Sequence, residues 1–167
     1  MTLSQLQKEQ AEWSARNFGP HPTWHPQLGM VEELGELAHS HLKSAQGIRG
    51  TPEEHKAAKV DAVADYMIFF ADVCNCEEMD METAVQIASE SPFSKFADRH
   101  HPHECILSAM ESTANRSYYR AIAHLMGYCR HEGIDFESAI FSTWERVKQR
   151  NWRVDPLCAT TEPGGNT

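Results

Sequence analysis

The sequence has few positive charges and no long hydrophobic run. Fifteen Lys and Arg oppose 24 Asp and Glu among 167 residues, so the net charge is −9 at neutral pH. Such a balance disfavours binding to nucleic acid or to anionic lipid. No segment approaches the ~18 to 20 apolar residues that a membrane span needs, and the first residues lack the apolar stretch of a signal peptide. We therefore expect a cytoplasmic protein with no nucleic-acid or membrane partner, in which a cation lies between the protein and any anionic substrate.

Paired cysteines and strand signals are also scarce. The five cysteines include no CxxC pair, and Cys74 and Cys76 are too close together for a zinc knuckle, so we expect reduced, apolar thiols. Apolar positions recur with helical spacing from end to end, and no convincing alternating run is present. The sequence predicts an all-α chain with a single domain over residues 1–155 and a flexible tail over residues 156–167.

Start and stop signals bound the predicted helices. Thr51, Pro52 and Glu54 combine a capping residue, a proline at the first helical position and a glutamate at the third. The prolines of residues 19–26 indicate a loop, as do those of residues 91–104. The expected helices cover residues 4–17, with Ser4 as the cap, and residues 26–43, 52–75, 80–89, 104–131 and 135–151.

A pattern of long helix, turn and Asp-capped helix occurs twice, at an offset of 55 residues. Cys74 and Asp80 of the first copy align with Cys129 and Asp135 of the second. The repeat suggests two related helical hairpins packed into a bundle. Any two helices opened by an aspartate would match about as well, so duplication and coincidence both stay open.

Two of the predicted helices carry rows of carboxylates among apolar residues. Glu32, Glu33 and Glu36 lie within one turn of the second helix, and Asp61 and Asp65 are four residues apart in the third. An unpaired carboxylate is costly to desolvate, so such rows need a compensating positive charge. Two adjacent rows would form an oxygen-rich slot of the kind that holds Mg²⁺ or Mn²⁺ and leaves water positions free for a phosphate.

Other interpretations of these acids stay open. Asp72, seven residues after Asp65, shares the predicted face of Asp61 and Asp65 and belongs to the same acid row. In one alternative, all of these acids lie on a solvated face and pair with lysines, as most surface acids do. Glu36 and His39 form an ExxH motif of the kind found in ferritin-like di-iron oxidases, which need it twice, and residues 98–101 are the single later analogue. A non-catalytic helical module would use the acids to dock a partner.

Ten histidines are present, and three of them, His100, His101 and His103, lie close together. They alternate with a proline in a polar segment. This composition favours an exposed connector over a transition-metal site.

The motif EELGE (residues 32–36), followed after about 25 residues by DAVAD, resembles the MazG-type all-α nucleoside triphosphate pyrophosphohydrolases. Their pattern is EExxE, a spacer and then E-x-x-D, and Asp65 falls on the final aspartate. Ala62 stands where the family has the first glutamate of the second motif. Asp61, in i, i+4 register with Asp65, is the candidate to replace that ligand.

The likeness covers residues 3–86 and returns at TWERVKQRNW, which is similar to the last helix of small phage and integron members. The length and the stretch HLKxxQGIR are similar to the phage group called MazZ, which removes the terminal diphosphate of dGTP. A phage-encoded member would act in the host cytoplasm.

The resemblance implies hydrolysis of a (deoxy)nucleoside triphosphate between the α- and β-phosphates, with conversion of dGTP to dGMP as the best candidate. Two or three Mg²⁺ or Mn²⁺ ions would be held by Glu33, Glu36, Asp61 and Asp65. Glu32 would position or deprotonate the attacking water.

Further residues are candidates for holding the substrate. For the pyrophosphate they are Lys43, Arg49, Lys148, Arg150 and Asn151. For the base they are Trp13, Asn17 and Trp24. A basic residue on a helix is more often a solubilising group, and a tryptophan is more often part of the core. Because four or five helices can hardly enclose a nucleotide, we also expect a homodimer or homotetramer.

Overall fold

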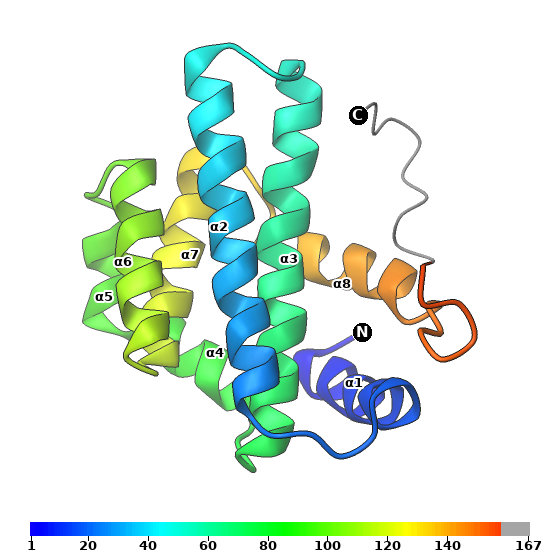
Figure 1. Ribbon diagram of the computed structural model, residues 1–167. Coiled ribbons are helices and arrows are strands. Elements are labelled where there is room, and N and C mark those ends of the chain that lie inside the picture. Colours follow the sequence, from blue (N-terminus) through cyan, green and yellow to red (C-terminus); the bar gives the residue numbers. More distant parts are fainter. Residues whose placement is uncertain (158–167) are drawn as a thin grey trace.

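The computed structural model describes residues 1–157, and this part of the chain is helical without any strand (Figure 1). Its eight helices are α1 (Leu3–Asn17), α2 (Trp24–Gln46), α3 (Pro52–Cys76), α4 (Met81–Glu90), α5 (Pro92–Ala97), α6 (Pro102–Ala114), α7 (Tyr118–Glu132) and α8 (Phe136–Val147). The prediction of an all-α chain is confirmed for the described residues. None of these helices has both the length and the hydropathy needed to cross a bilayer. Most of the predicted flexible tail lies outside the described residues.

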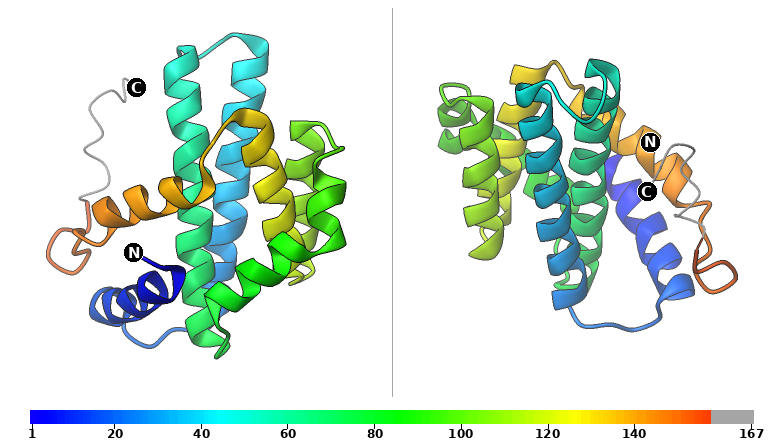
Figure 2. Two further views of the ribbon diagram at one scale, coloured as in Figure 1. Left: turned by 180° about the vertical axis from the view of Figure 1, so that it is seen from behind. Right: turned by 45° about the horizontal axis from the view of Figure 1, so that its top comes forward.

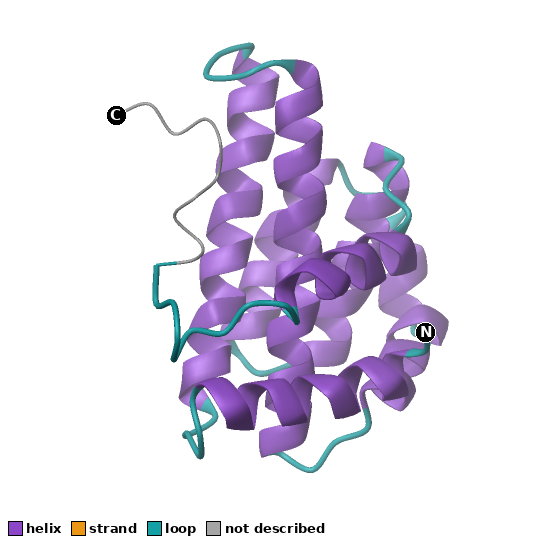
Figure 3. Cartoon of the chain, turned by 90° about the vertical axis from the view of Figure 1, so that its right-hand side faces the viewer, coloured by secondary structure: helices purple, strands orange, loops and turns teal. Residues whose placement is uncertain are grey.

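The two longest helices, α2 and α3, run antiparallel through the middle of the molecule (Figure 1). Helices α1 and α8 lie across one side of this pair (Figure 3), and α5, α6 and α7 lie on the other side, reached through α4 (Figure 2). α2 and α3 approach closely because Gly29 has no side chain, and a Cβ there would lie 2.5 Å from the ring of Phe69. This contact fixes which faces of the two helices meet.

α3 is the central helix and is buried on several sides. Thirteen of its 25 residues are buried, because it packs against α1, α2, α4 and α8. Polar groups on such a helix need partners. Accordingly, the Tyr66 hydroxyl shares a hydrogen bond with Thr113 Oγ1 at 2.9 Å, and Lys59 Nζ donates to Glu132 Oε2 at 2.8 Å.

Local capping explains where the helices begin. The Thr51 hydroxyl accepts from the Glu54 N–H at 3.2 Å, and the Glu54 carboxylate accepts from the Thr51 N–H at 2.7 Å, which confirms the predicted start of α3. The prediction of Ser4 as the cap of the first helix was wrong. Thr2 caps α1, because Gln5 lies at the third helical position and completes a reciprocal capping box with it.

The two Asp-capped units predicted from the sequence are present. Asp80 accepts from the Thr83 N–H at 2.7 Å at the start of α4, and Asp135 accepts from the Ser138 N–H at 2.8 Å at the start of α8. α4 packs against α7, and α8 packs against α3. The short helix of each unit therefore contacts the long helix of the other.

The helix predicted over residues 104–131 is two helices, which corrects the sequence interpretation. α6 ends at Ala114 and α7 begins at Tyr118. Between them Arg116 has a φ of 57°, a conformation that breaks a helix, and its guanidinium forms an ion pair with Glu77.

Other helix boundaries also differ from the prediction, among them the end of α2, which lies at Gln46 and not at Lys43. The supposed loop of residues 91–104 contains α5 and the start of α6. α2 begins at Trp24, since a proline such as Pro26 is tolerated in a first turn. α8 ends at Val147, so residues 148–151 lie in the turn that follows it.

Candidate metal centre

Four carboxylates, Glu33 and Glu36 of α2 and Asp61 and Asp65 of α3, belong to two helices that pack together, and they act on one another's pKa. We call this group the carboxylate slot. Burial and the negative charges of Asp65, Glu36, Glu32 and Asp61 together raise the pKa of Glu33 to about 9, and burial has the largest effect. Charges act on one another this way only at short range. The acids of the two helices therefore face one another.

The pKa values of Asp65 and Glu36 are raised for the same reasons as that of Glu33. Burial and the charge of Asp61 raise the pKa of Asp65 to about 7, against the opposing effects of Arg150 and Arg146. The pKa of Glu36 is also raised, first by burial and then by Glu32 and Asp61. Each of these acids is thus destabilised as an anion by its surroundings, and a divalent cation would relieve all of them together.

The oxygen-only donor set fits a hard cation. Within residues 1–157, no three of the slot's acids bring carboxylate oxygens within 4.8 Å of one another. Mg²⁺ is usually held by one or two carboxylates together with several waters and substrate oxygens. Four acids that are spread along two helices therefore fit two or three ions better than a single ion bound by all four. Ala62 is buried and offers no ligand, whereas Asp61 is half-buried at the edge of the slot.

Arg146 of α8 is a site residue that sequence reasoning missed. Its Nη2 donates to Asp61 Oδ1 at 2.5 Å, and to Thr143 Oγ1 at 3.1 Å. It lies inside the TWERVKQRNW segment. The likeness of that segment to the last helix of phage and integron members was the one feature of the sequence that pointed to this residue. The ion pair places a guanidinium at the rim of the carboxylate slot.

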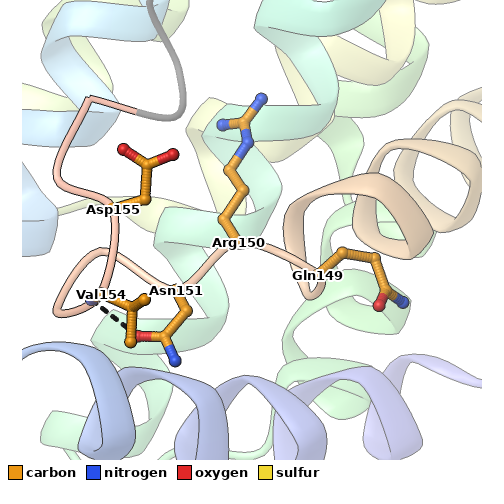
Figure 4. Close-up of a pocket in the computed structure, with 5 residues that line it drawn as sticks. All are labelled: Gln149, Arg150, Asn151, Val154 and Asp155. Atoms are coloured by element: carbon orange, nitrogen blue, oxygen red, sulfur yellow. Dashed lines mark hydrogen bonds between the residues drawn. The ribbon is translucent and has the colours of Figure 1, made fainter.

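Arg150 is the second basic group near the slot. It belongs to the turn after α8, where a cavity of about 310 Å³ is lined by Gln149, Arg150, Asn151, Val154 and Asp155. In Figure 4 its side chain extends away from that turn, over α3, in keeping with its electrostatic effect on Asp65. Asn151 lines the same cavity, and its side-chain oxygen accepts from the Val154 N–H at 3.3 Å (Figure 4).

A larger cavity, of about 540 Å³, lies beside the slot. It is lined by Asn17, Phe18, Pro20, His21, Pro22, His25, Pro26, Phe69 and Asp72. Phe69 is one helical turn from Asp65, about 6 Å along the α3 axis. We call this space the aromatic cavity.

Asp72 belongs to the aromatic cavity and not to the carboxylate slot, which corrects its predicted placement on the acid row. Its Oδ2 accepts from Ser14 Oγ at 3.4 Å and contacts His21 Nε2 at 3.0 Å. The charge and the hydrogen bond of Asp72 help to raise the pKa of His21, as does the Gly19 carbonyl, against the effect of burial. Both contacts use Oδ2, and no described residue donates a hydrogen bond to Oδ1.

Of the three residues predicted to bind the base, Asn17 alone lines the aromatic cavity. Trp13 is buried against Trp144, and its indole N–H donates to the Arg150 carbonyl at 3.0 Å, so it is a core residue and the prediction was wrong. Trp24 is exposed beside the cavity and packs edge-on against His25.

Three of the predicted basic residues make no hydrogen bond or ion pair with an acid of the slot within residues 1–157. Lys148 Nζ pairs with Glu145 at 2.7 Å and Glu9 at 3.3 Å. Lys43 Nζ donates to Gln46. Arg49 lies in the connection between α2 and α3. Their role in binding pyrophosphate stays a prediction.

The ferritin-like alternative lacks its second motif. His39 is exposed next to Glu36, but residues 98–101 lie in the turn between α5 and α6, where Asp98 pairs with Arg130. A pair of facing ExxH helices is therefore missing from the described part of the chain.

No family model matches the chain, and no curated protein or solved structure matches it either. The functional conclusion therefore depends on the slot, its two arginines and the aromatic cavity.

Proposed function

We propose that this protein hydrolyses a (deoxy)nucleoside triphosphate between the α- and β-phosphates, with dGTP as the first candidate substrate. The observation that carries the proposal is the grouping of four carboxylates on two adjacent helices, where Asp65, Glu36 and Asp61 all raise the pKa of Glu33. The reaction class follows from the resemblance of EELGE and DAVAD to the MazG-type pyrophosphohydrolases. An acidic protein would thus meet an acidic substrate through metal ions.

Glu33, Glu36, Asp61 and Asp65 would hold two or three Mg²⁺ or Mn²⁺ ions. When bound, the ions neutralise the triphosphate and lower the pKa of the attacking water. Their binding also removes the mutual repulsion that raises the pKa of Glu33 and of Asp65.

Glu32 is exposed at the rim of the slot, next to Glu33. In the proposed reaction its carboxylate accepts a proton from water as the water oxygen bonds to the α-phosphorus. The bond from the α-phosphorus to the bridging oxygen breaks, and pyrophosphate leaves with that oxygen.

Arg146 and Arg150 are the proposed phosphate-binding groups. Both side chains of the ion pair between Arg146 and Asp61 are exposed to solvent. The pair therefore contributes little stability, and either residue can readily take another partner. A guanidinium that leaves Asp61 for a phosphate would form charge-assisted hydrogen bonds with it and free the carboxylate for a metal ion.

The aromatic cavity is the proposed place of the base. Phe18, His25 and Phe69 offer ring faces for stacking, and stacking is worth about 1–3 kcal/mol per base. The free Oδ1 of Asp72 would accept from a base N–H, and guanine presents such donors on its Watson–Crick edge. The distance of one helical turn between Phe69 and Asp65 suits a nucleotide whose phosphates lie in the slot.

We also infer that a second copy of the chain covers the outer face of α2. Trp24, Leu28, Val31 and Leu42 are 56%, 59%, 47% and 50% exposed and recur with helical spacing on this face. Exposed apolar residues that share one face of a helix are typical of an oligomer interface. A homodimer or homotetramer would place a neighbour beside the slot, and a Leu28→Glu variant that becomes monomeric in light scattering would locate the contact.

The experiment that tests the function is pyrophosphate release from a panel of ordinary and altered nucleoside triphosphates, with Mg²⁺, with Mn²⁺ and with EDTA. We expect turnover that vanishes in EDTA and in the Glu36→Gln and Asp65→Asn variants. Glu12→Gln, which alters an exposed acid on α1, is the matched control and should retain activity. Turnover that survives in EDTA, or in Glu36→Gln, would refute the proposal.

A further inference from the structure

A second group of metal-ligating side chains lies where α5, α6 and α7 meet. His100 follows α5, Cys105 lies in the first turns of α6, and His124 lies in the middle of α7. One ligand atom from each of these residues lies within 4.8 Å of the other two. This group shares no residue with the carboxylate slot, and its chemistry is independent of the proposed hydrolysis.

His124 is the clearest sign that the group binds something. The residue is 1% exposed, and neither of its ring nitrogens has a hydrogen-bond partner within the described chain; His100 Nδ1 lacks one as well. Nearly all buried polar groups in proteins are hydrogen-bonded, so three such nitrogens at one place need an explanation. An ion that accepts a lone pair from each imidazole accounts for two of the three, one nitrogen of each ring.

Two of the three residues have strongly shifted pKa values. Burial and the nearby charges of His100 and Arg120 together lower the pKa of His124 to about 4, so its ring is neutral and has a free lone pair. Burial raises the pKa of Cys105 to about 11, while Arg130 opposes that rise. A bound metal ion displaces a thiol proton, and the N-terminal end of α6 favours the resulting thiolate.

The surrounding fold holds the three side chains in place. Gly127 lets the end of α5 press onto α7, because a Cβ there would lie 2.5 Å from Ala97 Cβ. The Ala97 carbonyl accepts from Cys105 Sγ at 3.5 Å. The rings of His100 and His124 are stacked with centroids 5.7 Å apart. Ligands from two helices and from the turn after α5 are thus brought together before any ion binds.

We propose that His100, Cys105 and His124 bind one transition-metal ion, with Zn²⁺ as the best match. One thiolate and two imidazoles are ligands that Zn²⁺ prefers and Mg²⁺ does not, so the two sites of the protein select different ions. Three protein ligands leave one position of a tetrahedron for water or another donor. The bound ion links the connector between α5 and α6 to the centre of α7.

Cobalt substitution tests the site directly, with no need for an activity assay. The full-length protein is stripped with a chelator and titrated with Co²⁺, whose bond to a thiolate gives a charge-transfer band in the near ultraviolet. We expect one equivalent to produce this band and Zn²⁺ to displace it. Cys105→Ser should abolish the band, and His100→Ala should weaken Zn²⁺ affinity by at least about 100-fold.

Two matched controls separate this site from others. Cys76→Ser removes the thiol of another group, formed with His21 and Asp72, and should leave the band unchanged. His103→Ala removes an exposed neighbouring histidine and should leave the Zn²⁺ affinity unchanged. Circular dichroism of each stripped variant establishes that it is folded.

Several results would overturn the proposal. A band that survives in Cys105→Ser but is lost in Cys76→Ser would assign the thiolate to the other group. The absence of any band in the wild-type protein would exclude a thiolate site. If Cys105→Ser does not fold, the test is the Zn²⁺ affinity of His100→Ala, because His100 is partly exposed and its loss should disturb the fold less. An unchanged affinity in that variant would reject the site.

Discussion

Arg146 of α8 donates a hydrogen bond from Nη2 to Oδ1 of Asp61 on α3, at 2.5 Å. The two side chains are 57% and 41% exposed, so water competes with the pair. The contact connects the last helix to the carboxylate slot across 85 residues of sequence. In the proposed function, Asp61 would exchange this guanidinium for a metal ion.

Removal of Arg146 should weaken substrate binding more than it harms the fold. A charge-assisted hydrogen bond to phosphate is worth ~1.5–3 kcal/mol, so Arg146→Ala should lower kcat/KM by about tenfold to 100-fold, mainly through KM. Arg146→Lys should retain part of the effect, because Lys keeps the charge but not the planar fork. Arg16→Ala, at an exposed arginine of α1, is the control. An unchanged KM in Arg146→Ala would remove this residue from the site.

The metal-free protein should lose stability as the pH rises. The pKa of Glu33 is 4.5 as an ordinary side chain and about 9 in the fold, so between these values the folded state binds more protons than the unfolded state. The free energy of unfolding therefore falls with increasing pH across this window. Urea unfolding in EDTA at a series of pH values measures the slope, which Mg²⁺ should flatten by stabilising the ionised form.

The Glu33→Gln variant isolates the contribution of Glu33 to the pH dependence of stability from that of the other acids. The neutral amide should raise the stability of the metal-free protein by about 1–3 kcal/mol near the top of the window, and it should reduce the slope. Glu12→Gln should change neither. A slope that is the same in Glu33→Gln as in the wild type would show that Glu33 is not strained by its neighbours.

Two glycines of α2 offer a matched test of the contact between α2 and α3. A Cβ at Gly29 would lie 2.5 Å from the Phe69 ring, whereas a Cβ at Gly35 would meet nothing within 4 Å. Gly29→Ala should cost about 1–3 kcal/mol through overpacking, and it should raise KM because the displaced ring enters the aromatic cavity. Gly35→Ala should stabilise the protein by about 0.5–1 kcal/mol.

Thermal and denaturant unfolding measure both effects. Light scattering accompanies them, since Gly35 lies on the exposed side of α2. Equal stabilisation by the two substitutions would mean that α2 and α3 do not approach closely at Gly29.

The buried ion pair of Lys59 and Glu132 should behave differently from the surface pairs. Its side chains are 8% and 22% exposed, and Nζ lies 2.8 Å from Oε2. Glu132→Gln leaves a buried ammonium without a counter-charge and should cost about 3 kcal/mol. The double variant Lys59→Met with Glu132→Leu should recover most of that loss, as measured by a double-mutant cycle in urea. A loss in the double variant equal to the sum of the two single losses would exclude coupling between them.

The parts of the fold that could be predicted are those encoded locally. The capping box of Thr51 and Glu54 and the caps Asp80 and Asp135 need only neighbouring residues, so the starts of α3, α4 and α8 were correct. The break at Arg116 was missed, because the apolar stripe continues through it and arginine gives no turn signal.

The residues of the candidate sites also fall into those that local spacing predicts and those that depend on tertiary packing. The acids of α2 and α3 follow from i, i+3 and i, i+4 spacing within each helix. The contact of Asp61 with Arg146 and the approach of His100 to His124 depend on how separate helices pack, so local spacing gave no sign of them. Trp13 was misjudged for the same reason, because its burial against α8 is a tertiary contact.

Anomalous diffraction from crystals grown with Mn²⁺ tests the central claim most directly. We predict peaks between α2 and α3, at about 2.0–2.3 Å from carboxylate oxygens of Glu33, Glu36, Asp61 or Asp65. Peaks confined to other surfaces, with these four carboxylates turned to solvent or held by arginines in the presence of excess Mn²⁺, would contradict it.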